Sequence, residues 1–163
     1  MNPELARPQK RSKAPNDVGS PTALPAFERI LLATNPDDAS EAALAAAALA
    51  RGSGGSVLVL CVLETTPAST HGPAVIDECS PQAHKEASEK LQAALTLLRA
   101  LGVKDASGRV ECGIVEDVVL RLATPADFDV VVLGSAKHRR GTNAYVMAHA
   151  RVPVMTMPSG ISL

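Results

Sequence analysis

The chain has 163 residues, which fits one domain, because domains of about 100 to 150 residues are the commonest. Apolar residues make up 46% of it, yet it holds two Phe, one Tyr and no Trp, so its core must consist of Val, Leu, Ile and Ala. The formal net charge of −1 offers no basic field for phosphate backbones or anionic membranes, so we expect neither nucleic acid nor membrane as a partner.

The first segment, residues 1–26, contains five prolines among scattered charges and shows no hydrophobic period. Such a composition cannot offset the entropy lost on ordering, so we expect a disordered Pro-rich tail that folding does not need. Residues 27–163 should form one α/β domain. No apolar signal core follows Lys10 and Arg11, and no run approaches the roughly 18 apolar residues of a membrane span. We therefore expect a cytoplasmic protein.

The three cysteines are odd in number and show no C-x-x-C spacing; they are Cys61, Cys79 and Cys112. Two of them lie in or beside apolar runs, where a free cysteine behaves as a small hydrophobic residue. The pattern predicts reduced cysteines, in agreement with a cytoplasmic location.

Short apolar runs alternate with helical periodicity along the rest of the chain. The predicted strands are 29–33, 57–63, 109–112, 130–133 and 152–157, and the third and fifth of them have the polar residues or the proline typical of a sheet edge. The predicted helices are 42–50 behind an Asp38 and Glu41 capping pattern, 81–101 behind Ser80, 114–125 and 142–150. The connection 64–80 is longer than usual, and we expect a flexible excursion there.

This alternation predicts a five-stranded parallel, doubly wound, Rossmann-like sheet with four helices on both faces. Such sheets bind ligands at the carboxyl ends of the strands where the strand order reverses. The loops after the first and fourth strands, at Asn35 and Gly134, are therefore the places where we expect a site.

Two segments resemble the universal stress protein family. The run from Phe27 to Asn35 is similar to the family's opening strand, with Asn35 at the position of its usual aspartate. The second match is similar to the C-terminal signature of the family; it consists of Asp129 to Ser135, Gly141 with Thr142, Val146, and Val152 to Val154. The resemblance covers 27–158, and for the sheet we expect the order 3-2-1-4-5. It implies a stress-response protein that is not an enzyme, with unknown protein partners, and that forms a homodimer through Val152 to Met157.

The nucleotide-binding loop departs from the family pattern. ATP-binding members carry a glycine, two residues, a second glycine, nine residues, and a glycine followed by Ser or Thr. Gly134 and the pair Gly141 and Thr142 match the ends of this pattern, but Lys137 replaces the second glycine and only six residues separate Gly134 from Gly141. Glycines let backbone amides approach phosphate oxygens closely. We therefore expect weak or lost ATP binding.

An adenine-nucleotide sensor that binds ATP or AMP at low affinity is the alternative function. Lys137, Arg139 and Arg140 would then hold an anion by charge, whereas otherwise they are solvated loop charges. The candidate binding residues, at the ends of the first and fourth strands and the start of the last helix, are Thr34, Asn35, Gly134, Ser135, Arg140, Gly141, Thr142 and Asn143.

Other patterns fail on position or spacing. The glycines of 52–55 precede a strand, whereas a dinucleotide-binding loop follows one. Ser135 lacks the G-x-S-x-G context of a hydrolase nucleophile, and Asp37 with Asp38 fits helix capping better than acid and base catalysis. The four histidines show no metal-ligand spacing. The sequence thus predicts neither catalytic residues nor a metal site.

Overall fold

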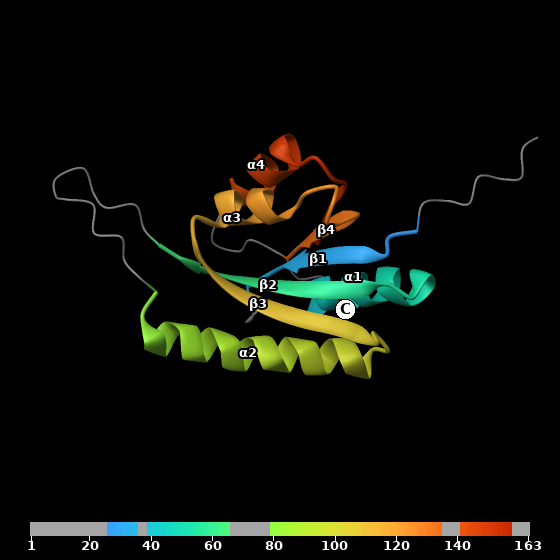
Figure 1. The fold of residues 1–163 in the computed structure, drawn as a ribbon, viewed down its shortest axis with the longest axis horizontal. Helices are drawn as coiled ribbons and strands as arrows, with labels where there is room; N and C mark the ends of the chain where they lie inside the picture. The colour runs from blue at the N-terminus through green and yellow to red at the C-terminus, as the bar shows by residue number, and fades with distance from the viewer. Residues whose placement is uncertain (1–25, 36–38, 66–78, 135–140, 158–163) are drawn as a thin grey trace, which may run out of the picture.

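The computed structural model describes residues 26–35, 39–65, 79–134 and 141–157. Within them a five-stranded parallel sheet has the order β3-β2-β1-β4-β5 (Figure 1). The strands are β1 Arg29–Ala33, β2 Ser56–Glu64, β3 Asp105–Gly113, β4 Val130–Leu133 and β5 Val154–Thr156. The helices are α1 Ala39–Ser53, α2 Pro81–Ala100, α3 Val115–Leu122 and α4 Thr142–His149. The predicted fold class and strand order are confirmed.

Strand β1 lies at the centre of the sheet, between β2 and β4. Ile30 pairs in register with Val57 on one side and Val130 on the other. Ile30, Leu31 and Leu32 are each 0% exposed, as an apolar run predicts for a strand covered on both faces. Successive side chains point to opposite faces, so β1 contributes to both halves of the core.

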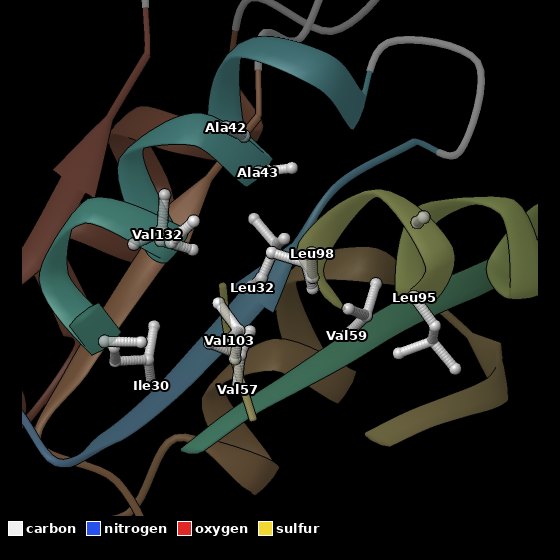
Figure 2. Packing of buried hydrophobic residues seen from close by; sticks show 14 of the residues in the cluster. Ile30, Leu32, Ala42, Ala43, Val57, Val59, Leu95, Leu98, Val103 and Val132 are labelled. Atoms are coloured by element: carbon white, nitrogen blue, oxygen red, sulfur yellow. The ribbon is translucent and has the colours of Figure 1, made fainter. Parts of the chain in front are cut away.

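Helices α1 and α2 cover one face of the sheet. The alanines of α1 are small enough to bring the helix close to the sheet, and Figure 2 shows Ala42 and Ala43 beside Leu32 and Val132. The longer α2 adds Leu95 and Leu98 over β2. The hydroxyl of Ser80 caps α2 as predicted, because its oxygen accepts a hydrogen bond from the Ala83 N–H at 3.1 Å.

Helices α3 and α4 cover the other face, on the opposite side of the sheet from α2 (Figure 1). Val118 and Val119 of α3 and Val146 of α4 join Leu31 and Val131 in this half of the core. Ile114, the first residue of the predicted third helix, is 41% exposed and precedes the observed helix at its N-cap position. The inward face begins instead at Val118.

The two edge strands differ in length from the prediction. Strand β3 begins at Asp105, four residues earlier than expected, and pairs with β2 along its whole length. Its first residues have low strand propensity, so pairing with β2 rather than local preference holds them extended. Strand β5 is shorter than expected and starts at Val154, because Pro153 has no N–H to donate to the ladder.

One prediction about the cysteines is wrong. Cys79 and Cys112 form a disulfide whose Cα atoms lie 6.1 Å apart, although the two residues are 33 positions apart in the sequence. The parallel crossover brings the start of α2 beside the end of β3, and neither residue spacing nor local hydrophobicity reveals that contact. Cys61 in β2 is 3% exposed and is packed in the core, as expected.

Several other expectations fall on residues that the structure leaves undescribed. These are the tail apart from Ala26, the cap at Asp38 and most of the 64–80 connection, so each stays a prediction. In the described part of the chain, no helix combines the length and the apolar character that crossing a membrane requires.

An ion pair fastens the start of β1 to the residue before β4. The Asp129 carboxylate accepts hydrogen bonds from the backbone N–H groups of Glu28 at 3.1 Å and Arg29 at 2.9 Å, and from the Arg29 guanidinium at 2.6 Å. The Arg29 guanidinium also donates to the Ala126 carbonyl. The hydrogen bond from the Arg29 side chain, helped by the two backbone donors, outweighs desolvation and holds the pKa of Asp129 below its usual value.

Because the folded-state pKa of Asp129 is lowered, its ionised form stabilises the fold above the unfolded pKa of about 3.9, and this contribution is lost as the pH falls through the folded pKa. We predict that Asp129→Asn lowers the free energy of unfolding by about 1 kcal/mol at pH 7. The difference from wild type should shrink below about pH 4. Urea unfolding at a series of pH values measures this difference in the free energy of unfolding. Asp105→Asn is the control, because Asp105 is an exposed residue of β3. A difference that does not change with pH would contradict the assignment.

Candidate functional site

The carboxyl ends of β1 and β4 lie side by side at the point where the strand order reverses. The chain passes from β1 to β2 and β3 on one side, and from β4 to β5 on the other. The Gly134 N–H donates to the Ala33 carbonyl at 3.0 Å, so the residues that follow the two strands start in contact. This is the position at which open α/β sheets bind ligands.

Gly134 and Thr34 pack against each other directly. A Cβ built at Gly134 would lie 3.0 Å from the Thr34 Cβ and would overlap the Thr34 Oγ1. Gly134 is buried, so any larger residue there would require Thr34 to shift. The Thr34 hydroxyl donates to the Asn35 carbonyl at 3.1 Å, and Asn35 itself is exposed.

Helix α4 begins beside the same strand ends. The side-chain amide of Asn143 donates to the Gly134 carbonyl at 3.2 Å and so ties the first turn of α4 to the end of β4. Gly141 precedes the helix, and its carbonyl accepts the Tyr145 N–H at 2.9 Å. A Cβ at Gly141 would meet nothing within 4 Å. Close packing against Thr34 therefore favours glycine at 134, whereas the space at 141 is open.

The Thr142 side chain forms a hydrogen bond that the sequence did not predict. Its side chain is buried, and its hydroxyl donates to Glu116 Oε1 at 2.7 Å. Glu116 lies in the first turn of α3, where the helix dipole favours a negative charge. The two residues are 26 positions apart in the sequence. They meet because α3 starts after β3 and α4 starts after β4, and these parallel strands end on the same side of the sheet.

The second carboxylate oxygen of Glu116 has an unusual environment. Oε2 is buried and has no hydrogen-bond partner among the residues that the structure describes. A buried polar oxygen without a donor is unusual, because it has given up its hydrogen bonds to water. Glu116 therefore places a carboxyl group at the start of α4, with Oε1 on the Thr142 hydroxyl and Oε2 buried.

The structure thus brings four of the eight candidate residues together, namely Thr34, Gly134, Thr142 and Asn143. Asn35 and Gly141 lie beside them and are exposed, while Ser135 and Arg140 are outside the described residues. Glu116 was missed. The one available signal was its position just after the third strand, at the edge where the site was expected. In the described ranges there is no group of three or more His, Cys, Asp or Glu side chains placed to hold a metal ion.

Comparisons with known proteins agree on a family. A sequence model described as the universal stress protein family matches residues 26–158. No curated protein matches the chain in sequence.

Among solved structures, a universal stress protein in complex with cAMP is 17% identical, with a TM-score of 0.65, over 83% of this chain and 100% of that one. The universal stress protein from Archaeoglobus fulgidus in complex with dAMP is 22% identical, with a TM-score of 0.58, over 81% and 98% of the two chains. The universal stress protein UspA from Lactobacillus plantarum is 20% identical, with a TM-score of 0.65, over 82% and 99%. At such identities these structures support the fold.

The two glycines give a matched test of the packing at the site. We predict that Gly134→Ala lowers the free energy of unfolding by about 1–3 kcal/mol, because the added Cβ overlaps Thr34. Gly141→Ala should stay within about 0.5 kcal/mol of wild type, because the space around it is open. Chemical denaturation measures both. Equal losses from the two variants would show that the close approach of Gly134 and Thr34 is not the constraint.

Proposed function

The chain belongs to the universal stress protein family, and on this premise we propose that it is a non-enzymatic stress-response protein of the cytoplasm that acts as a homodimer and binds ATP weakly or not at all. The proposal of weak or absent ATP binding rests on the 2.7 Å hydrogen bond from the Thr142 hydroxyl to Glu116. This bond engages the hydroxyl that the family motif would place on a phosphate.

The chemistry of this contact opposes phosphate binding in two ways. A threonine hydroxyl has one hydrogen to donate, and here Glu116 receives it. A phosphate oxygen at the same place would also meet the carboxylate charge. Two like unit charges 4 Å apart repel by about 4 kcal/mol at an effective dielectric constant of about 20. A repulsion of that order would weaken phosphate binding, and the Glu116→Gln variant below measures its size.

The sequence of the loop supports the same conclusion. Lys137 replaces the second glycine of the motif, and six residues separate Gly134 from Gly141. Asn35 offers a neutral amide where the family usually has a carboxylate acceptor. Each change removes a feature by which ATP-binding members hold the nucleotide.

A second candidate function is an adenine-nucleotide sensor with low affinity. Two of the similar structures were determined with cAMP or dAMP, each of which carries a single phosphate group. One phosphate introduces less negative charge near Glu116 than three do. Tighter binding of AMP than of ATP favours this function, whereas a lack of binding by both favours the first.

We predict a dissociation constant for ATP in the high-micromolar to millimolar range, which corresponds to about 4 to 6 kcal/mol. Glu116→Gln should tighten it about tenfold or more, because the amide oxygen can still accept from Thr142 while the charge is gone. Calorimetric titration with ATP, ADP and AMP, with and without magnesium, measures these values.

Asp117→Asn is the matched control for this titration, because it removes the same charge from the adjacent, exposed position of α3. Its affinity for ATP should equal that of wild type. A submicromolar affinity of the wild-type chain, or equal gains from the two variants, would contradict the proposal.

We propose that the homodimer forms through the last strand, because that edge of the sheet exposes backbone groups and apolar side chains. Strand β5 pairs with β4 on one side and leaves the backbone groups of its other side without a strand in the described structure. Met155 is 36% exposed, and α4, which packs beside β5, exposes Tyr145 and Met147 by 48% and 54%. Antiparallel pairing of two copies about a two-fold axis would cover such an edge. A monomer with its edge blunted by Pro153 is the alternative.

Substitutions in β5 separate these two states. Val154→Asp and Thr156→Pro should each give a monomer, because one places a charge in the contact and the other removes a donor. Light scattering at tens of micromolar protein measures the mass. Gln92→Asp, on the exposed surface of α2 on the other face of the sheet, should leave a dimer. A monomeric wild type, or a dimer that both β5 variants leave intact, would exclude this interface.

A further inference from the structure

The disulfide between Cys79 and Cys112 joins two elements at the edge of the sheet. Cys79 immediately precedes the N-cap residue of α2, and Cys112 is the last residue but one of the edge strand β3. Both α2 and most of β3 therefore lie inside the covalent loop that the bond closes. The remaining cysteine, Cys61, is buried in β2.

The two sulfur atoms differ in ways that matter for exchange chemistry. Cys112 is an exposed residue and Cys79 is half-buried, so we assign the attack of a small thiol to the Cys112 side of the bond. Cys79 lies at the N-terminal end of a 20-residue helix, an environment that stabilises a departing thiolate. Accessible disulfides with a stabilised leaving thiolate are the labile ones, whereas structural disulfides are shielded.

We propose that Cys79 and Cys112 form a reversible dithiol and disulfide couple that exchanges with small thiols such as glutathione and that fastens α2 to the end of β3 when oxidised. Disulfides in the cytoplasm are usually transient and redox-sensing, because the thiol pool reduces exposed bonds. That setting rests on the location proposed above, while the exchange itself is tested with purified protein and does not depend on location.

The reduction step balances with two molecules of reduced glutathione. The first glutathione thiolate attacks Cys112 Sγ, the bond between the protein sulfurs breaks, and Cys79 leaves as a thiolate that takes up a proton. A second glutathione thiolate then attacks the glutathione sulfur of the mixed disulfide, which releases the Cys112 thiolate and forms glutathione disulfide. The protein gains two electrons and two protons, and two glutathione molecules lose them. Oxidation by glutathione disulfide is the reverse.

Oxidation should also change stability. Closing the loop between residues 33 positions apart restricts the unfolded chain and so favours the folded one. The bond holds the end of β3, from which the chain continues into α3 and Glu116. The oxidised protein should therefore unfold at a higher temperature than the reduced one.

The test equilibrates the full chain in buffers with a range of reduced and oxidised glutathione, traps free thiols with a maleimide, and counts them by intact mass. We expect the mass to shift by two labels together, with one midpoint inside the range that glutathione mixtures cover, while native Cys61 stays unlabelled. Thermal unfolding of the oxidised form should occur several degrees above that of the reduced form.

Single-cysteine variants complete the test. Cys79→Ser and Cys112→Ser should each abolish the redox-dependent difference in melting temperature, whereas Cys61→Ala should keep it. The reduced wild-type protein serves as the folded reference if a serine variant is poorly stable. A bond that survives excess reduced glutathione in the native protein, a bond that never forms in glutathione disulfide, or a redox response that depends on Cys61 would overturn the proposal.

Discussion

The close approach of β1 and β4 at their carboxyl ends is the constraint on which the rest of the structure depends. Gly134 donates its N–H to the Ala33 carbonyl and packs so closely that a side chain there would displace Thr34. The Gly134 carbonyl then accepts from Asn143 and so fixes where α4 starts. Arg29 and Asp129 fasten the opposite ends of the same two strands. The geometry of the site is therefore a consequence of how two central strands pair.

This geometry is common to ligand-binding α/β sheets, and in this chain it brings a carboxylate to the start of α4. Three separate elements form the candidate site: the end of β4, the start of α4 and the first turn of α3. Their convergence places Glu116 on the Thr142 hydroxyl, where a nucleotide phosphate would need a donor. The proposal of weak ATP binding rests on this contact, because a carboxylate beside the Thr142 hydroxyl disfavours a phosphate there.

Local patterns in the sequence predicted the central strands and α2 well, because the apolar runs of β1 and β4 and the capping residue Ser80 carry their signals within a few neighbours. The first half of β3 was missed, since Asp105 to Gly108 are held by pairing with β2 and not by their own propensity. The disulfide and the contact of Glu116 with Thr142 join residues 33 and 26 positions apart, so no local pattern could reveal them. The family resemblance supplied the place of the site and the glycine pattern but not the carboxylate.

The most direct measurement of the central claim is a high-resolution crystal structure of the chain in millimolar ATP. The distance that decides it joins Glu116 Oε1 to Thr142 Oγ1, which is 2.7 Å here. We predict that this hydrogen bond persists and that no phosphate oxygen contacts the Thr142 hydroxyl. A phosphate bound to that hydroxyl, with the Glu116 carboxylate turned away, would contradict the account.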